Sequence, residues 1–288
     1  MSSVIIAGCG FAGLATARVL HEAGWSVLGL THSAESAAAL ASEPFPAMAC
    51  DISDPAALRA TAAAITAQPD AVIHCASSGR GGADAYRSVY LEGSRNLLDA
   101  LAPKRFLFTS STSVYAQTDG GCVTEESPAA PPRETGRILR ETEDLVLSRG
   151  GIVARLAGIY GPGRSVLLRK FFSGEAVIED DGQRVVNQVH RDDIASALQV
   201  LITRATSGIY NVCDDAPMPQ REIYEWLTAR FALPLPPNGP IDPNRKRGWT
   251  SKRVSNAKLR TLGWEPRFPS FFDAVERQPD LVALAQRA

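Results

Sequence analysis

The sequence predicts an α/β protein: a Rossmann-like, doubly wound parallel sheet closed by a small C-terminal substrate lobe. Two observations predict this fold. Short apolar segments alternate with Ala-rich helical segments from residue 3 to residue 156, and a glycine-rich turn follows the first apolar segment. Strand–helix alternation implies parallel pairing with right-handed crossovers, and strands covered by helices on both faces are continuously apolar.

The predicted strands are residues 3–8, 26–30, 46–50, 71–75, 105–109 and 151–156, and the predicted helices are residues 12–23, 34–41, 55–67, 85–101 and 134–148. After Tyr160 the pattern predicts a helix, a turn and a short strand over 164–190, a helix over 192–204 and a strand over 208–212. We expect a dinucleotide-binding core of residues 1–163, to which residues 190–213 return. Residues 164–189 and 214–288, which include a Pro-rich stretch, are expected to form the substrate-binding lobe.

Composition and charge argue against a nucleic-acid-binding protein, a membrane protein and a disulfide- or zinc-stabilised protein. Lys and Arg number 30 against 31 Asp and Glu, so the net charge of -1 argues against a nucleic-acid partner. No apolar run reaches the roughly 18 residues of a membrane span, and the N-terminus lacks a signal-peptide pattern. The five Cys form no CxxC motif, which favours reduced thiols over a disulfide or zinc framework. We expect a cytoplasmic protein with a small-molecule substrate, no membrane partner and no metal.

The glycine turn predicts a dinucleotide site. Gly8 permits a tight turn, Gly10 lets the backbone approach a pyrophosphate, and Gly13 lets the helix pack close to the strand. The phosphates would then lie at the helix N-terminus, where backbone N–H groups and the helix dipole favour anions.

The end of the second predicted strand indicates which dinucleotide is preferred. A carboxylate at this place binds the ribose 2′-hydroxyl of NAD. Here the chain has Thr31, His32 and Ser33 instead, whose side chains could accept a 2′-phosphate. We therefore expect NADP(H) to be preferred and NAD(H) to be possible, with the alternative that His32 is an ordinary surface histidine.

Further motifs occur in order from residue 8 to residue 264. They are the glycine turn, Asp51-Ile52, His74-Cys75-Ala76, Ser110 to Tyr115 (SSTSVY), Arg155 to Arg164 (RLAGIYGPGR), Val189 to Asp193 (VHRDD), Gly208 to Val212 (GIYNV) and Leu262-Gly263-Trp264. With them the chain resembles the extended short-chain dehydrogenase/reductases, the NAD-dependent epimerase/dehydratase superfamily. The resemblance implies that Asp51 binds adenine, that Ala76 and Ser77 line the cofactor, and that Ser111 is the catalytic hydroxyl. The expected cofactor-binding residues are Gly8, Gly10, Phe11, Ala12, Gly13, Thr31, His32, Ser33, Asp51, Ile52, Cys75, Ala76 and Ser77.

One departure from this family concerns its chemistry. The family uses a Tyr and a Lys four residues later on one helix, where the Lys lowers the pKa of the Tyr. Alignment of the helix 134–148 places Thr135 and Leu139 at these two positions. No other YxxxK exists in the chain, because the residues four before its five Lys are Ala100, Val166, Asp242, Gly248 and Val254. The chain therefore resembles an atypical member that lacks the pair.

Other residues could replace the missing acid. Tyr115 follows Ser111 by four residues and could act as an acid helped by Arg140 or His190, and Glu134 could act as a base. The alternatives are that Tyr115 and His190 are packed structural residues and that Glu134 is a solvated carboxylate of a first helical turn. The expected substrate-binding residues are Ser78, Tyr115, Arg164 and His190.

These observations leave three functions open. The first is an oxidoreductase or an epimerase/dehydratase-like enzyme acting on a small hydroxyl- or carbonyl-bearing metabolite or a sugar nucleotide. The second is a redox-silent NADP(H)-binding sensor or partner-binding protein, and the third is a non-redox isomerase or lyase. A basic run, Arg245–Arg247 with Lys252 and Arg253, could clamp a phosphate or be a solvated loop. A homodimer is possible through the apolar helix face of Tyr86, Tyr90, Leu97, Leu98 and Leu101, although burial within the chain would produce the same pattern.

Overall fold

A single parallel sheet organises the N-terminal two thirds of the protein. The computed structural model describes residues 1–65, 67–79, 81–242 and 248–287. Its sheet has seven strands in the order β12-β7-β5-β4-β1-β2-β3, and all neighbours are parallel. The strands are β1 (Ser3–Ala7), β2 (Ser26–Thr31), β3 (Ala47–Ala49), β4 (Ala71–His74), β5 (Arg105–Ser111), β7 (Ile152–Leu156) and β12 (Gly208–Val212). The predicted fold class is confirmed, with strand bounds within two residues of the sequence pattern.

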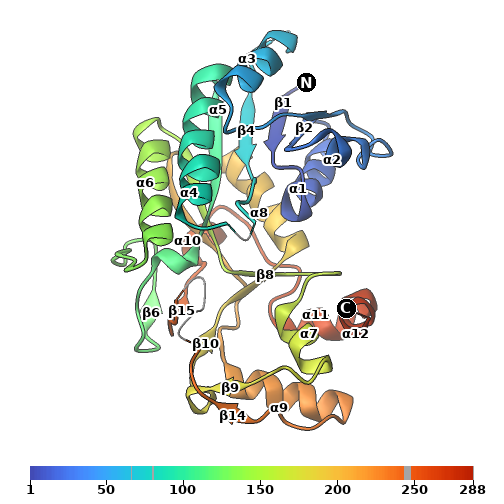
Figure 1. Cartoon of the computed structure of the whole chain (residues 1–288), viewed down its shortest axis with the longest axis vertical. Helices are drawn as coiled ribbons and strands as arrows, with labels where there is room; N and C mark the ends of the chain where they lie inside the picture. The colour runs from blue at the N-terminus through green and yellow to red at the C-terminus, as the bar shows by residue number, and fades with distance from the viewer. Residues whose placement is uncertain (66, 80, 243–247, 288) are drawn as a thin grey trace.

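Helices cover both faces of this sheet. Helices α1 (Phe11–Glu22) and α8 (Arg191–Arg204) pack together on one face. On the other face lie α3 (Pro55–Ala64), α5 (Gly93–Leu101) and α6 (Glu134–Ser148), as Figure 1 shows. Because helices cover both faces, β4 and β7 are buried along their whole length. The short helix α2 (Ala34–Ala38) connects β2 to the edge strand β3.

The segment predicted as one helix over 85–101 is divided in the structure. It consists of α4 (Ala83–Tyr86), a π-helical turn η1 (Arg87–Glu92) and then α5. Single π turns are uncommon and occur frequently at functional sites. Gly93 follows the turn and lies against Ile52, since a Cβ there would be 3.0 Å from Ile52 Cδ1.

The remaining elements form the lobe and its connections. The lobe contains α7 (Val166–Phe172), α9 (Gln220–Phe231), α11 (Phe271–Arg277) and α12 (Pro279–Gln286), which lie at the lower end of Figure 1. The short elements are η2 (Thr112–Val114), β6 (Cys122–Val123), β8 (Gly158–Tyr160), β9 (Ile178–Glu179), η3 (Asp180–Gly182), β10 (Val185–Val186), β11 (Gln188–His190), β13 (Met218–Pro219), β14 (Asn238–Gly239), β15 (Arg253–Val254) and α10 (Ala257–Arg260). The two-stranded pairs among them join segments far apart in the chain, such as β15 with β6.

Two hydrophobic clusters correspond to the sheet and the lobe. The smaller cluster draws on α7, α9, α11 and α12, with Phe171, Tyr224 and Phe271 among its buried aromatic side chains. The larger cluster fills the space between the sheet and its helices. Leu259 and Trp264 belong to this larger cluster, so this part of the range predicted for the lobe packs on the Rossmann core.

The apolar helix face considered for a homodimer is buried within the chain. Tyr86, Tyr90, Leu97, Leu98 and Leu101 are each at most 9% exposed. Packing against the protein's own core therefore accounts for the pattern, and a homodimer stays a prediction. No helix of the described residues is both long and apolar enough to cross a membrane.

Candidate functional site

The candidate site lies where the strand order reverses, between β1 and β4. Parallel sheets bind ligands at the carboxyl ends of their strands at such a point. The turn after β1 is held there because the backbone N–H groups of Gly8 and Cys9 both donate to Leu30 O at 2.9 Å. Across the opening, Cys75 N donates to Ala7 O at 2.7 Å, which brings the end of β4 beside the turn.

Glycine is required at two positions of the turn. Gly8 has φ +92°, and a Cβ on it would lie 2.2 Å from Ala76 N. A Cβ on Gly13 would lie 2.2 Å from Gly8 O. By contrast, nothing lies within 4 Å of a Cβ on Gly10, which is the N-cap of α1 and makes no side-chain cap. The turn is therefore closely packed at Gly8 and Gly13 and has open space at Gly10. This open space fits a pyrophosphate at the N-terminus of the helix.

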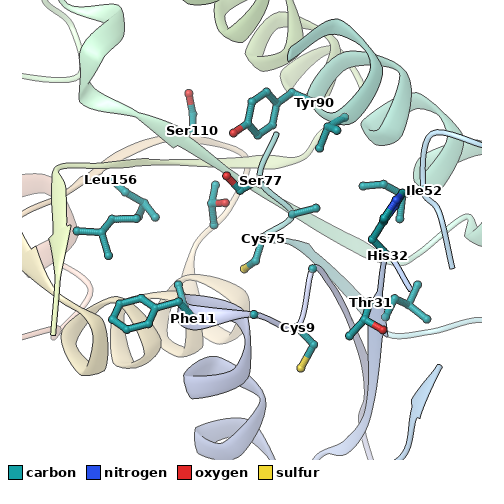
Figure 2. A pocket seen from close by; sticks show the side chains of 18 of the residues that line it. Cys9, Phe11, Thr31, His32, Ile52, Cys75, Ser77, Tyr90, Ser110 and Leu156 are labelled. Carbon is teal, nitrogen blue, oxygen red and sulfur yellow. The ribbon is translucent and has the colours of Figure 1, made fainter. Parts of the chain in front are cut away.

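A cavity of about 410 Å³ extends over this turn. Figure 2 shows Phe11 and Leu156 toward one end and His32 and Ile52 toward the other. The predicted cofactor residues that line it are Gly8, Gly10, Phe11, Ala12, Thr31, His32, Asp51, Ile52, Cys75, Ala76 and Ser77. Gly13 and Ser33 do not line it: Gly13 packs beneath the turn, and Ser33 Oγ caps α2 by accepting from Ser36 N at 3.2 Å.

His32 and Asp51 lie together at one end of the cavity. Asp51 Oδ1 accepts hydrogen bonds from Ser53 N at 2.9 Å and Ser53 Oγ at 2.7 Å. His32 Nδ1 lies 3.8 Å from the same oxygen, and its side chain is 81% exposed. Asp51 is thus oriented by Ser53, while most of the His32 side chain is open to solvent.

Ser111 and Arg164 line the opposite part of the cavity. Ser111 ends β5, is 6% exposed, and its Oγ accepts from Ser113 N at 3.2 Å. The guanidinium of Arg164 lies 5.3 Å from the centre of the Phe11 ring. Both residues therefore line the cavity, while their contact with a cofactor or substrate stays a prediction.

The helix face that the family uses for its Tyr and Lys does face the site. Leu139 lines the large cavity, and it lines a smaller adjoining cavity together with Thr135. Leu139 is 4% exposed. The two aligned positions of α6 therefore lie at the cavities, and they carry a hydroxyl and an apolar side chain where the family pattern has a phenol and an ammonium group.

Tyr115 lines neither cavity. It is fully buried, and its hydroxyl donates to Asn211 Oδ1 at 2.9 Å. The Arg155 guanidinium lies 4.8 Å from the centre of its ring. Burial raises the pKa of the Tyr115 phenol, against the opposing effect of Arg155. A buried phenol with a committed acceptor cannot reach a substrate, so this placement argues against a catalytic or substrate-binding role for Tyr115.

Three other predicted residues also lie off the cavity walls. Glu134 is exposed on the first turn of α6. His190 is buried: its Nδ1 accepts from Asp192 N at 3.2 Å, so its Nε2 donates to Gln278 Oε1 at 2.7 Å. Burial lowers the pKa of this imidazole. Ser78 lies just beyond the cavity, and its N donates to Tyr90 Oη at 3.4 Å.

The structure adds two tyrosines that sequence reasoning treated only as apolar. Tyr86, the last residue of α4, and Val89 and Tyr90 of the π turn line the large cavity, and Tyr86 also borders the smaller cavity. The rings of Tyr86 and Tyr90 meet edge to face, with centroids 4.9 Å apart. Periodicity alone could not separate a core tyrosine from a cavity tyrosine, because both are buried by the same helix face.

A buried ionic network under the cavity was also missed. Ser110, on the cavity wall, donates to Glu143 Oε1 at 2.5 Å. Arg155 donates to both oxygens of the same carboxylate, at 3.0 and 2.6 Å, and Arg140 donates to it as well. Glu143 is 0% and Arg155 1% exposed. These residues come from three elements, so their contact was not visible in the sequence.

The smaller cavity, of about 50 Å³, lies between α6 and the segment Gly248–Thr250. It shares Tyr86 and Leu139 with the large cavity, so the two are neighbours. Of the basic run noted in the sequence, Arg245–Arg247 lie outside the described residues. Lys252 is buried, and burial together with the charge of Arg184 lowers the pKa of its ammonium group to about 8.

Comparisons with known proteins agree on the family. The family model of the NAD-dependent epimerase/dehydratases matches residues 4–213. Protein YeeZ of Escherichia coli strain K12 is 33% identical over 286 residues, which cover 93% of this chain and 97% of YeeZ. A Methylobacillus flagellatus structure, assigned to the NAD-dependent epimerase/dehydratases, is 28% identical with a TM-score of 0.80, covering 100% of this chain and 99% of its own. The Thermus thermophilus UDP-glucose 4-epimerase, solved with NAD, has a TM-score of 0.80 at 19% identity over 100% and 99% of the two chains, and it shares the fold.

Proposed function

Because the chain belongs to the NAD-dependent epimerase/dehydratase family, we propose that it is an NAD(P)-dependent enzyme acting on a small hydroxyl- or carbonyl-bearing metabolite. The observation that carries the proposal is that its two cavities adjoin each other. The large cavity runs from the glycine turn to Ser111, and the smaller one adjoins it at Tyr86 and Leu139. A dinucleotide in the first would present its reactive end to a substrate in the second.

The residues of the large cavity fit a nicotinamide dinucleotide. Gly10 leaves open space over the N-terminus of α1 for the pyrophosphate, and Asp51 stands at the adenosine end. When bound, such a cofactor supplies a hydride donor or acceptor. Ser111 would hold the substrate oxygen by a hydrogen bond, since it is the hydroxyl that ends β5 at the opposite end of the cavity.

We propose Tyr86 as the residue that exchanges a proton with the substrate. It borders both cavities, whereas Tyr115 borders neither. A positioned acid or base contributes roughly 10²- to 10⁴-fold in rate. Tyr86→Phe should therefore lower kcat by about that factor. The matched control, Tyr90→Phe, removes the neighbouring phenol hydroxyl and should keep most of the kcat of the unaltered protein. Equal activity of Tyr86→Phe and the unaltered protein would refute this assignment.

NADP(H) is the proposed preference. No carboxylate stands directly after β2, since the first is Glu35 in α2, and His32, which lines the cavity, is exposed enough to meet a 2′-phosphate. The protein should bind NADPH at least about tenfold more tightly than NADH in a calorimetric titration. His32→Asp should reverse that order, because a carboxylate repels a phosphate and accepts from a ribose hydroxyl. Preference of the unaltered protein for NADH would refute this part.

The overall proposal is tested by titration with both dinucleotides, followed by a substrate panel read at the nicotinamide absorbance. Binding of a dinucleotide and a turnover that falls in Ser111→Ala would support it. Absence of any dinucleotide binding would overturn it. We also propose a cytoplasmic location, which the five free cysteines, all in the described part of the chain, support through the reducing chemistry of that compartment.

A second candidate function is a redox-silent NADP(H) sensor. Leu139 favours it, because an apolar side chain now lines the site where the family places its Lys. A sensor would bind the dinucleotide tightly, show no turnover on any substrate, and be unaffected by Ser111→Ala. The same titration and panel therefore separate the two functions.

A further inference from the structure

The smaller cavity has the volume of a small chemical group. Its volume of about 50 Å³ is a few times the 10–15 Å³ that one water centre needs, which suits a group of three or four heavy atoms. Among the described residues that line it are Ser113, Arg133, Thr135, Trp249 and Thr250. None of the lining residues described by the structure is Asp or Glu.

Trp249 supplies a hydrogen-bond donor that lacks an acceptor. Its Nε1 is buried and has no hydrogen-bond partner among the described residues. An indole N–H can only donate, and a buried donor left unpaired is costly. An acceptor from outside the chain would satisfy it.

One cationic side chain, Arg133, lines the cavity, and a second, Lys252, is hydrogen-bonded to the lining residue Thr250. Arg133 lines it and lies against Gly248, since a Cβ on Gly248 would lie 3.3 Å from Arg133 Nε. Lys252 Nζ donates to Thr250 Oγ1 at 2.9 Å and to Tyr115 O at 3.0 Å. Because Lys252 only donates, Thr250 accepts from it and keeps its own proton for another acceptor. The residues that line the cavity therefore include hydrogen-bond donors and a positive charge.

We propose that this cavity binds a carboxylate of the substrate, which makes the substrate a small hydroxy acid or the corresponding oxo acid. A carboxylate has three heavy atoms and only accepts hydrogen bonds when ionised, so it matches both the volume and the donors. The inference rests on the proposed function, because the large cavity must hold the dinucleotide beside it. A guanidinium and a carboxylate form a charge-assisted pair, which gives Arg133 the largest share of the affinity.

The experiment uses the full chain saturated with NADPH and labelled with ¹⁵N at its tryptophans. Trp249→Phe identifies the indole N–H signal of Trp249 in a two-dimensional spectrum. Glycolate is the probe, glycolamide is its neutral counterpart, and inorganic phosphate is the competing anion. We expect glycolate to shift this signal in a saturable way, while glycolamide and phosphate leave it in place.

Arg133→Gln should weaken glycolate binding by roughly 10- to 100-fold, the scale of one charge-assisted hydrogen bond. The matched control is Arg149→Gln, at the other end of the same 15-residue helix and paired with Asp99. It should bind glycolate as the unaltered protein does. Both variants should bind NADPH equally well, since neither residue lines the large cavity.

Three results would overturn the inference. They are an indole signal that glycolate does not move although NADPH is bound, an Arg133→Gln variant with undiminished affinity, and a response to phosphate without one to glycolate. Binding of NADPH and NADH is measured first, and NADH takes the place of NADPH if it alone binds. Binding of neither would refute the proposed function and this inference together, whereas failure of glycolate with a dinucleotide bound would refute the inference alone.

Discussion

The buried pair of Glu143 and Arg155 leads to a quantitative prediction about stability. Glu143→Leu removes a carboxylate that receives four hydrogen bonds, two of them from Arg155. The guanidinium of Arg155 is 1% exposed, so it would remain charged and without water. Breaking a buried pair in this way typically costs about 3–5 kcal/mol. We expect a loss of that size in the free energy of unfolding.

The double variant distinguishes a charge effect from a packing effect. Glu143→Leu with Arg155→Met leaves no unpaired buried charge from this pair, and Arg140 keeps its second partner, Asp144, at 2.7 Å. Replacement of a whole buried pair by apolar side chains is often close to neutral. The double variant should therefore be more stable than the Glu143→Leu single variant, by about 2 kcal/mol or more.

The assay is urea unfolding followed by circular dichroism, with Glu141→Gln as the matched control. Glu141 lies on the same helix and pairs with Arg87 at 3.2 Å, but both side chains are about half exposed. Such surface pairs contribute at most about 1 kcal/mol. A Glu143→Leu variant as stable as the Glu141→Gln control, or a double variant less stable than the single one, would refute the reasoning.

Three further predictions follow from the site and the lobe. Gly8→Ala should lower both thermal stability and dinucleotide affinity, because its Cβ would lie 2.2 Å from Ala76 N; an unchanged melting temperature would contradict this. Gly10→Ala should keep the melting temperature but weaken dinucleotide binding in calorimetry by at least about tenfold, since its Cβ meets only the open space where a pyrophosphate would lie. Burial raises the pKa of the Asp193 carboxyl to about 6 from 3.8, so the group contributes stability below about pH 4 that is lost as the pH rises through 6. In urea unfolding between pH 4 and pH 7, Asp193→Asn should lack the corresponding decline of about 3 kcal/mol, and an identical pH dependence of both proteins would contradict the assignment.

The fold was predictable because its signals are local. Each strand is a short apolar run, and the bounds of α6 agree with the prediction at both ends. The glycine turn was equally local: Gly8 adopts a positive φ that its sequence position anticipated. Local patterns could not predict the π turn after Tyr86. It adds one residue to a helical turn, and its residues, Arg87–Glu92, include no Gly or Pro that would indicate an irregular turn.

The part of the site proposed to act on a substrate was less predictable, because it depends on which way buried side chains point. Tyr115 was expected beside the substrate on the strength of its spacing from Ser111. In the structure its hydroxyl bonds to Asn211, 96 residues away in the chain. Tyr86 was expected in an apolar face and borders both cavities instead. Spacing along a chain specifies on which face of a helix or strand a residue lies. The neighbouring elements decide whether that face lines a cavity or packs in the core.

The sequence by itself determined the layer architecture, the place of the dinucleotide turn and the absence of a Tyr–Lys pair, since the five lysines could each be checked for a partner. Only the tertiary structure decided what surrounds the missing pair: Leu139 on the cavity wall, Glu143 and Arg155 beneath it, and Trp249 across the smaller cavity. The physical reason is the range of the interactions. Periodicity and turn chemistry act over a few residues, whereas the burial and pairing of charged or polar groups depend on segments that meet only when the sheet and the lobe have packed.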